Sequence, residues 1–182
     1  HALLSLIAYA PADSAVHDSL QRSCISTLTL PADDWKVVPP YLAEFENLTD
    51  LSLQGCDSLE SVRGLTGLTQ LTNLDLSKSS FGTIPCDLGD IPGLTSLDLS
   101  YCKGFKNVNG LANCTQLTGL NLDRCTSLLN VDGLSNCTQL TSLNLNGCNS
   151  LQNVDGLANC TQLTSLKLSS CDALENVDGL AN

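Results

Sequence analysis

The sequence predicts a solenoid of stacked coils in the α/β class, with short parallel strands along one side. The first observation is a period of 23 residues between leucines that each open a segment of the form L-T-x-L-x-L. These leucines are Leu48, Leu71, Leu94, Leu117, Leu140 and Leu163. The second observation is that Ile25, followed by Leu28 and Leu30, keeps the same spacing one step earlier. A fixed period of about 20 to 29 residues around a short leucine motif is typical of a solenoid.

We therefore divide residues 25–182 into seven repeats and number the positions of each repeat from its first residue. They start at residues 25, 48, 71, 94, 117, 140 and 163. The last repeat is incomplete, so we expect further repeats or a partner to cover the C-terminal end. Residues 1–24 are predicted to form an N-terminal helical cap, although Ala8-Tyr9-Ala10 also resembles the cleavage site of a secretory signal. No stretch reaches the ~20 apolar residues of a membrane-spanning helix.

The sixth repeat shows what one coil should look like. Leu143, Asn144 and Leu145 alternate between apolar and polar, as in a short strand. After Cys148 the apolar residues recur every third position, and Asp155 is expected to act as an acidic N-cap for a single helical turn. Each coil is thus a strand, a bend, a 3₁₀-like return and a second bend. No single coil can bury its own apolar side chains, so the coils must stack.

The same inward positions recur in the other repeats. Position eighteen is leucine in all seven, at Leu42, Leu65, Leu88, Leu111, Leu134, Leu157 and Leu180. The third repeat deviates, because Ser79 occupies the usual cysteine position and Ile84-Pro85 replaces the valine step. We expect a local change of curvature there.

This pattern resembles the leucine-rich repeat family, LxxLxLxx(N/C)xL, over residues 25–182. LTSLNLNGCNSLQNVDGL (residues 140–157) is similar to the internalin and SDS22-like class, and LTNLDLSKSSFGTIPCDLGDIPGL (residues 71–94) is similar to the plant-type class. The cysteines at position twenty-one are similar to those of BspA-like surface proteins. The resemblance implies a right-handed solenoid with a curved parallel sheet on its concave face and short 3₁₀ turns and loops on its convex face. It also implies protein–protein recognition across the concave face.

Eight of the ten cysteines follow the repeat. Five lie at position nine, which are Cys56, Cys102, Cys125, Cys148 and Cys171, and three lie at position twenty-one, which are Cys114, Cys137 and Cys160. Because a thiol behaves as a small buried hydrophobe with a weak S–H donor, position nine is predicted to satisfy backbone carbonyls at the bend. We favour free thiols, since a ladder has no natural pairs, but a disulfide between stacked cysteines is geometrically feasible. No CxxC motif occurs, so we expect neither zinc nor a cofactor.

Positions two, three, five, seven and eight are expected to face the concave surface. Position two is nearly all threonine, and most of this face is small and polar. The exception is position eight of the central coils, where Lys78, Tyr101 and Arg124 should stand side by side, because Tyr and Arg are enriched at interface hot spots. We predict a partner-binding site of Asp75, Lys78, Asp98, Tyr101, Asn121, Asp123 and Arg124. The alternative is that these are solvated residues whose opposite charges satisfy one another.

Two further repeated features have alternative interpretations. The column of Asp132, Asp155 and Asp178 could supply oxygen ligands to calcium, but capping is the better interpretation because Gly-Leu follows each aspartate. Four N-x-T motifs would be glycan acceptors in a secretory compartment; they begin at Asn47, Asn113, Asn136 and Asn159. The sequons favour secretion and the thiols favour the cytosol, so localisation stays open.

The charge and the motifs favour binding of another protein over catalysis. A net charge of -11 with only eight Lys and Arg residues argues against nucleic acid as a partner. No nucleophile–base–acid set or Gly-rich phosphate loop occurs, so we expect no enzyme activity. The leading prediction is a non-catalytic module that binds a protein or peptide on its concave face. The alternatives are a structural subunit that stacks through its open repeat end and, more remotely, an ice- or crystal-binding protein that uses the threonine column.

Overall fold

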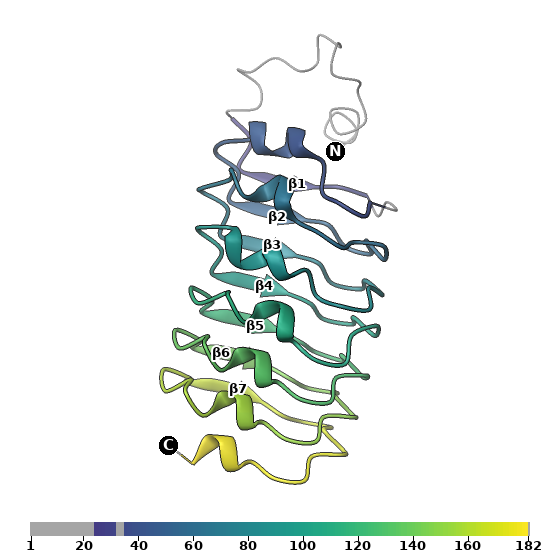
Figure 1. Cartoon of the computed structure of the whole chain (residues 1–182), viewed down its shortest axis with the longest axis vertical. Helices are drawn as coiled ribbons and strands as arrows, with labels where there is room; N and C mark the ends of the chain where they lie inside the picture. The colour runs from purple at the N-terminus through teal and green to yellow at the C-terminus, as the bar shows by residue number, and fades with distance from the viewer. Residues whose placement is uncertain (1–23, 32–34, 182) are drawn as a thin grey trace.

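The computed structural model describes residues 24–31 and 35–181. The predicted N-terminal cap lies outside the described residues, except for Cys24, which lies in a turn. Seven three-residue strands form one parallel sheet in the order of the sequence (Figure 1). The strands are β1 (Thr27–Thr29), β2 (Asp50–Ser52), β3 (Asn73–Asp75), β4 (Ser96–Asp98), β5 (Gly119–Asn121), β6 (Ser142–Asn144) and β7 (Ser165–Lys167).

The strand register follows the 23-residue period. Leu51 of β2 pairs with Leu28 of β1 on one side and with Leu74 of β3 on the other, and the same offset continues to β7. The middle residue of each strand points inward and its neighbours point toward solvent. An open sheet of seven parallel strands with 3₁₀ turns is the predicted fold class, so that prediction is confirmed.

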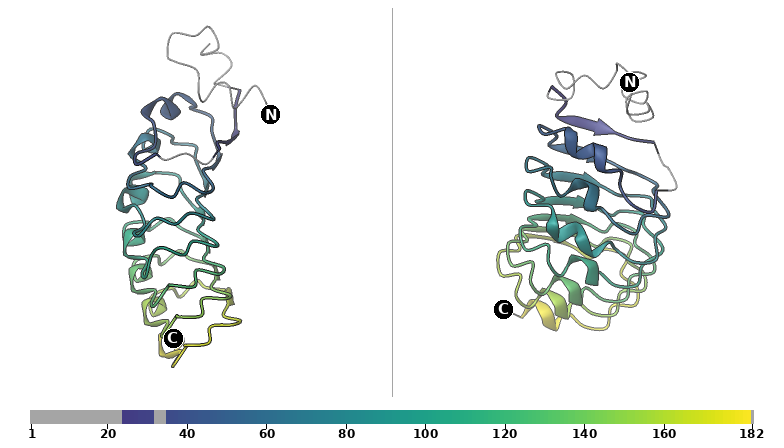
Figure 2. Two further views of the ribbon diagram at one scale, coloured as in Figure 1. Left: turned by 90° about the vertical axis from the view of Figure 1, so that its right-hand side faces the viewer. Right: turned by 45° about the horizontal axis from the view of Figure 1, so that its top comes forward.

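A file of 3₁₀ helices runs along the opposite side of the coils (Figures 1 and 2). The helices are η1 (Pro40–Glu44), η2 (Arg63–Leu65), η3 (Cys86–Asp90), η4 (Asn109–Leu111), η5 (Asp132–Leu134), η6 (Asp155–Leu157) and η7 (Asp178–Leu180). The part of the chain that the structure describes contains no α-helix, and none of its helices is long and apolar enough to cross a membrane.

The buried thiols at position nine join each coil to the one before it. Cys125 donates its S–H to the carbonyl oxygen of Leu99 at 3.1 Å, and Cys148 donates in the same way to Leu122 at 3.2 Å. Cys102 and Cys171 repeat the contact at 3.3 and 3.2 Å. The expected role of these cysteines at the bend is therefore confirmed, with the addition that the accepting carbonyl belongs to the preceding coil. All ten cysteines are free thiols in the structure.

The expected N-cap role of Asp132, Asp155 and Asp178 is wrong. These residues are the first residues of η5, η6 and η7, and the N-cap residues are valines that make no side-chain cap bond. The capping oxygen comes instead from the asparagine two residues before each aspartate. Asn153 Oδ1, for example, accepts the backbone N–H of Asp155 at 3.2 Å. The asparagine caps the helix because its side-chain oxygen accepts the first N–H of the helix. The side chain of the aspartate does not bond to that N–H.

Glycine at position seventeen allows the coils to approach closely. A Cβ atom on Gly133 would lie 2.2 Å from the carbonyl oxygen of Val108 in the preceding coil. The third coil has Asp87 at this position, and its carboxylate accepts the backbone N–H of Val62 at 3.0 Å. The backbone spacing on this side of the solenoid is therefore set by contacts between neighbouring coils.

Candidate partner-binding surface

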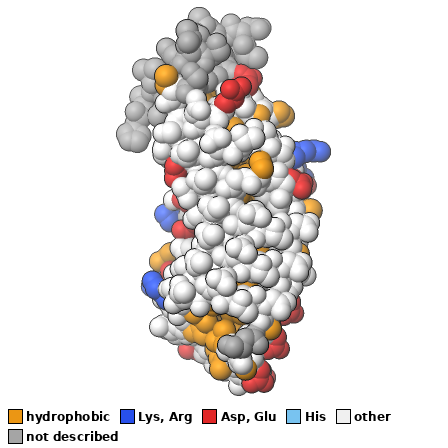
Figure 3. Space-filling view, turned by 90° about the vertical axis from the view of Figure 1, so that its left-hand side faces the viewer, with side chains coloured by type: hydrophobic (Ala, Val, Ile, Leu, Met, Phe, Trp, Pro, Cys, Tyr) orange, Lys and Arg blue, Asp and Glu red, His pale blue; other side chains and the backbone are white. Residues whose placement is uncertain are grey.

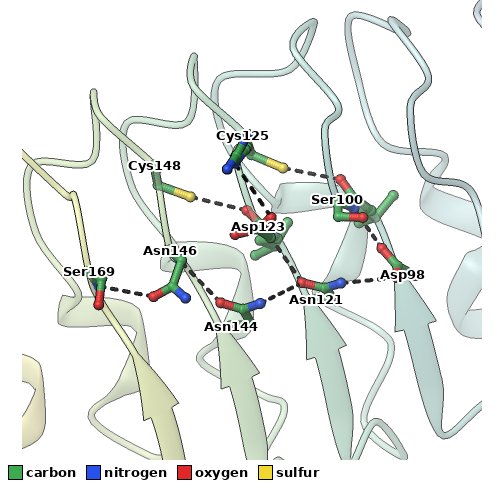
Figure 4. Close-up of polar contacts among 12 residues, drawn as sticks. Asp98, Ser100, Asn121, Asp123, Cys125, Asn144, Asn146, Cys148 and Ser169 are labelled. Carbon is green, nitrogen blue, oxygen red and sulfur yellow. Dashed lines mark hydrogen bonds and ion pairs between the residues drawn. The ribbon is translucent and has the colours of Figure 1, made fainter.

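The solvent-facing side of the seven strands, called the sheet face below, is covered by small polar side chains. Position five contributes the row Thr29, Ser52, Asp75, Asp98, Asn121, Asn144 and Lys167. Between β4 and β6 this row is joined by hydrogen bonds along the axis of the solenoid (Figure 4). Asn144 Nδ2 donates to Asn121 Oδ1 at 3.0 Å, and Asn121 Nδ2 donates to Asp98 Oδ2 at 3.0 Å.

Each of these side chains also accepts a backbone N–H two residues ahead. Asp98 Oδ1 accepts from Ser100 at 2.7 Å, and Asn121 Oδ1 accepts from Asp123 at 3.1 Å. A side chain held at both its own coil and the neighbouring coil loses little further freedom when a partner binds, so this row is a preorganised surface.

Asp75 lies beside Asp98 in the register of β3 and β4 but has its own donors. Its Oδ2 accepts from Gln54 Nε2 at 2.5 Å and from Ser52 Oγ at 3.2 Å, and its Oδ1 accepts the N–H of Ser77 at 2.9 Å. Partial burial raises the pKa of the Asp75 carboxyl, but the hydrogen bonds from Gln54, Ser77 and Ser52 outweigh it and leave the pKa below its ordinary value. Asp75 is therefore a carboxylate at neutral pH.

Position eight has a left-handed backbone in six consecutive coils. The φ values are 75° at Gly55, 60° at Lys78, 60° at Tyr101, 56° at Arg124, 68° at Gly147 and 58° at Ser170. This conformation aims the position-eight N–H at the next coil: Tyr101 donates to the Asp123 carbonyl at 2.7 Å, and Arg124 donates to the Asn146 carbonyl at 2.6 Å. The hydrogen-bond ladder thus extends beyond the strands, at positions where glycine would be the least strained residue.

Tyr101 and Arg124 form a pair at this column. The Arg124 guanidinium carbon lies 5.3 Å from the centroid of the Tyr101 ring, a cation–π distance, and Arg124 Nε lies 3.9 Å from Asp123 Oδ2. Gly147 leaves room for this arrangement, since a Cβ there would lie 3.0 Å from Arg124 Cγ. On the other side, Lys78 Nζ donates to Gln54 Oε1 at 3.2 Å.

The structure brings the seven predicted residues into two neighbouring rows across coils three to five. One row is Asp75, Asp98 and Asn121 at the strand ends, and the other is Lys78, Tyr101 and Arg124, with Asp123 beside the second row. The strands span only positions three to five, so positions seven and eight lie past the strand ends.

Sequence reasoning missed two parts of this surface. The first is the left-handed backbone of position eight, which glycine at Gly55 and Gly147 could have indicated. The second is a hollow of about 240 Å³ on the sheet face of β1 to β4, lined in part by Ser52, Asp75 and Asp98. Asp50 also lines it, and its carboxylate accepts from Asn73 Nδ2 at 2.7 Å and from Thr49 Oγ1 at 2.6 Å.

The threonines of position two bond within the fold. Thr141 Oγ1 donates to the Thr118 carbonyl of the preceding coil at 2.9 Å, and the same bond is made by Thr72, Thr95, Thr118 and Thr164. These hydroxyl hydrogens are therefore bonded within the protein. An ice- or crystal-binding protein would use the same threonine hydroxyls to contact the crystal surface. Figure 3, viewed from the side where the 3₁₀ helices lead back into the strands, shows a largely uncharged band with charged side chains at its margins.

Within residues 24–31 and 35–181, no group of three or more His, Cys, Asp or Glu side chains is placed to hold a metal ion. Asp132, Asp155 and Asp178, at the start of the last three 3₁₀ helices, are therefore not part of such a group.

Comparison with solved structures shows what this architecture is similar to. The leucine-rich repeat domain of the type III effector XopL superimposes with a TM-score of 0.64 at 23% identity, over 86% of this chain and 57% of that domain. Internalin C2 from Listeria monocytogenes gives a TM-score of 0.57 at 22% identity, over 100% of this chain and 88% of that one. RP105 from mouse, in its complex with MD-1, gives 0.59 at 24% identity, over 80% of this chain and 26% of that one.

These likenesses define the fold of the chain. The chain has the leucine-rich repeat fold, as the sequence pattern predicted. It spans 57% of the length of the XopL domain and about a quarter of RP105. No protein-family model matches the sequence, and a comparison with curated proteins gives no match.

Proposed function

We propose that this chain is a non-catalytic recognition module that binds a protein or peptide partner on its sheet face and on the adjoining positions seven and eight. The residues are Asp75, Lys78, Asp98, Tyr101, Asn121, Asp123 and Arg124. The observation that supports this most is the backbone of position eight. Three central coils place long side chains there, at Lys78, Tyr101 and Arg124, in a left-handed conformation that the flanking coils assign to Gly55 and Gly147.

A left-handed backbone costs a residue with a side chain about 1–2 kcal/mol relative to glycine. Strained conformations of this kind cluster at active sites and ligand-binding sites, where the strain is part of the mechanism. Tyr101 is 41% exposed, and in the described residues the other exposed large apolar side chains, Val177 and Leu180, lie in the last coil. Tyrosine and arginine are both among the residue types enriched at interface hot spots.

The sheet face also suits a protein partner in its shape. Its small side chains leave the strand backbones close to solvent, and its hydrogen-bonded rows hold the polar groups in place. One of the similar structures, RP105, is itself a complex with another protein, MD-1. That complex supports a protein partner here but does not identify it.

The test is a selection of random displayed peptides on the immobilised protein, followed by affinity measurements on the enriched peptides. The variant is the double substitution Tyr101→Gly with Arg124→Gly, which removes both side chains and keeps the left-handed backbone unstrained. We expect it to weaken binding at least about tenfold, or about 1.4 kcal/mol. Ser170→Gly, the same left-handed position in the last coil, is the matched control and should leave the affinity unchanged. Equal binding to wild type and the double variant would refute the proposed site.

A structural subunit that assembles through its last coil is the second candidate. Val177 is 48% exposed and Leu180 is 38% exposed. A hollow beside them is lined by Leu157, Leu163 and Leu166, and Figure 3 shows hydrophobic side chains gathered at this end. An eighth coil or another chain would cover this surface. Light scattering over a concentration series tests it: assembly that Val177→Asp abolishes would support the candidate, and a monomer at all concentrations would exclude it.

A further inference from the structure

We infer that the acidic part of the sheet face, formed by Asp50, Asp75 and Asp98, binds a cationic side chain, Arg or Lys, from an extended segment of the partner. This inference rests on the proposed function, because it assumes that the sheet face is the recognition surface. It adds the chemistry of the partner at one defined place, the hollow over β1 to β4.

The backbone hydrogen bond that Asp75 and Asp98 each accept does not require a negative charge. Each of these carboxylates accepts the N–H two residues ahead, from Ser77 and Ser100. At the same position of β5 and β6, the neutral amides of Asn121 and Asn144 make the same bond, to Asp123 and Asn146. Asparagine can therefore make this backbone bond as well as aspartate does. The second oxygen of each carboxylate accepts from side chains, from Gln54 and Ser52 at Asp75 and from Asn121 at Asp98.

Two of the carboxylates are neighbours. Asp75 and Asp98 are paired in the register of β3 and β4, and adjacent strands lie about 4.8 Å apart. Like charges directly opposite each other on a sheet destabilise it. A cation from the partner would relieve this repulsion, which is why the pair is better suited to the bound state than to the free one.

No cation of the described chain neutralises this cluster. In residues 24–31 and 35–181, no ion pair includes Asp50, Asp75 or Asp98. The carboxylates accept instead from neutral donors such as Asn73, Gln54 and Asn121. Lys78 directs its ammonium group to the Gln54 amide. The negative charge of the cluster is therefore available to a cation from outside this part of the chain.

The hollow has the size of a side chain. Its volume of about 240 Å³ lies below the range of about 300–1,000 Å³ for pockets that enclose drug-sized ligands. Its walls include Thr29 and Ser52, which are small enough to leave the strand backbones accessible. An extended peptide could therefore lay one long cationic side chain in the hollow while its next residues reach Tyr101.

The experiment uses a fluorescent alternating Ala-Arg octapeptide as the probe, with an alternating Ala-Gln octapeptide as its neutral counterpart. The variant is Asp75→Asn with Asp98→Asn, which keeps an oxygen that can accept the backbone N–H two residues ahead, as Asn121 and Asn144 do. The matched control is Asp132→Asn with Asp155→Asn, because it removes the same amount of charge from exposed positions on the 3₁₀ side. All proteins are checked for unchanged melting temperature.

We expect the Asp75/Asp98 variant to bind the Ala-Arg peptide at least about tenfold more weakly than wild type, with less dependence on salt concentration. The Asp132/Asp155 control should change the affinity less than about twofold. An equal loss in both variants would show attraction to net charge alone and would overturn the inference. So would no loss in either variant, or equal binding of the Ala-Gln peptide.

A calcium titration separates a metal from a peptide. Calcium that binds wild type and displaces the peptide, with both effects lost in the Asp75/Asp98 variant, would identify a metal site and overturn the inference. The proposed function is judged separately by the selected peptides. If the Asp75/Asp98 variant keeps the affinity of wild type and the Tyr101/Arg124 variant loses it, the inference fails and the proposed function stands. If neither variant loses affinity, both fail.

Discussion

The guanidinium of Arg124 lies over the ring of Tyr101 at 5.3 Å, and both residues adopt a left-handed backbone, with φ values of 56° and 60°. The backbone conformation is imposed by the ladder between coils, since each residue must aim its N–H at the carbonyl of the next coil. The side chains are not imposed by it, because Gly55 and Gly147 satisfy the same geometry without any. At these two residues the backbone conformation is required for the stability of the fold, whereas the side chains are not.

This separation predicts an unusual effect of Tyr101→Gly on stability. Relief of the left-handed strain, about 1–2 kcal/mol, is offset by about 0.5–1 kcal/mol for the extra freedom of glycine in the unfolded chain and by about 0.5–1 kcal/mol for the lost cation–π contact. The free energy of unfolding should therefore stay within about 1 kcal/mol of wild type. Tyr101→Val, which is β-branched and cannot adopt this φ without strain, should lower it by about 1–2 kcal/mol. Urea denaturation measures both, and a larger loss in the glycine variant would contradict the argument.

Close stacking of the coils predicts that Gly133→Ala is strongly destabilising. Its Cβ would lie 2.2 Å from the Val108 carbonyl oxygen and 2.5 Å from the Val108 carbonyl carbon, both backbone atoms that cannot move without shifting a coil. We expect a loss of about 2 kcal/mol or more in the free energy of unfolding. Gly119→Ala is the control, because the nearest atom to its Cβ, Ser96 Oγ, is 3.9 Å away. That variant should be neutral or more stable by up to about 1 kcal/mol, and similar losses in the two variants would disprove the stacking argument.

The buried thiols predict a loss of stability in alkaline solution. Burial raises the pKa of Cys102 and of Cys148 to about 12, against an ordinary value of 9.0. The folded protein keeps these protons where the unfolded chain releases them, so the contribution is complete below pH 9 and declines as the pH rises from about 9 to 12. The midpoint of urea denaturation, measured across this range, should fall with pH. Replacing Cys102 and Cys148 by alanine should reduce the slope, and an unchanged slope would argue against their role.

The same burial predicts which thiols react in the native protein. Cys24 and Cys86 are exposed and Cys171 is half-buried, whereas the other seven are buried. Alkylation at neutral pH, mapped by mass spectrometry, should modify Cys24 and Cys86 rapidly and Cys171 more slowly. Rapid modification of Cys125 or Cys148 in folded protein would show that the coils open there.

The capping of the 3₁₀ helices predicts that Asn153 contributes more to stability than Asp155 does. Asn153 Oδ1 accepts the N–H of Asp155, while Asp155 makes no side-chain cap bond. Asn153→Ala should therefore lower the free energy of unfolding by about 1 kcal/mol. Asp155→Ala should change it by less than about 0.5 kcal/mol. Thermal melts of the two variants measure the difference, and the reverse order would restore the aspartate as the cap.

The sequence by itself determined the features that are repeated within one coil. The 23-residue period, the alternation at Leu143 to Leu145 and the recurrent cysteines predicted the strands, the 3₁₀ returns, the stacking and the bond from position nine to a backbone carbonyl. These inferences succeeded because they depend on which side of a coil a residue occupies, and that follows from local periodicity. The candidate residues were also chosen from the sequence, although the partner-binding role assigned to them remains a proposal.

Only the tertiary structure decided how one coil meets the next. It directed the hydroxyl of Thr141 into the preceding coil and set the left-handed backbone under Tyr101 and Arg124. Within a single coil it also made Asn153, and not Asp155, the cap. It also placed Asp75 beside Asp98 above a hollow. The physical reason is that most of these partners lie in the neighbouring coil, and that the cap depends on the exact direction of one N–H group. Periodicity specifies which face a residue is on, but not which atom of the neighbouring coil it will bond.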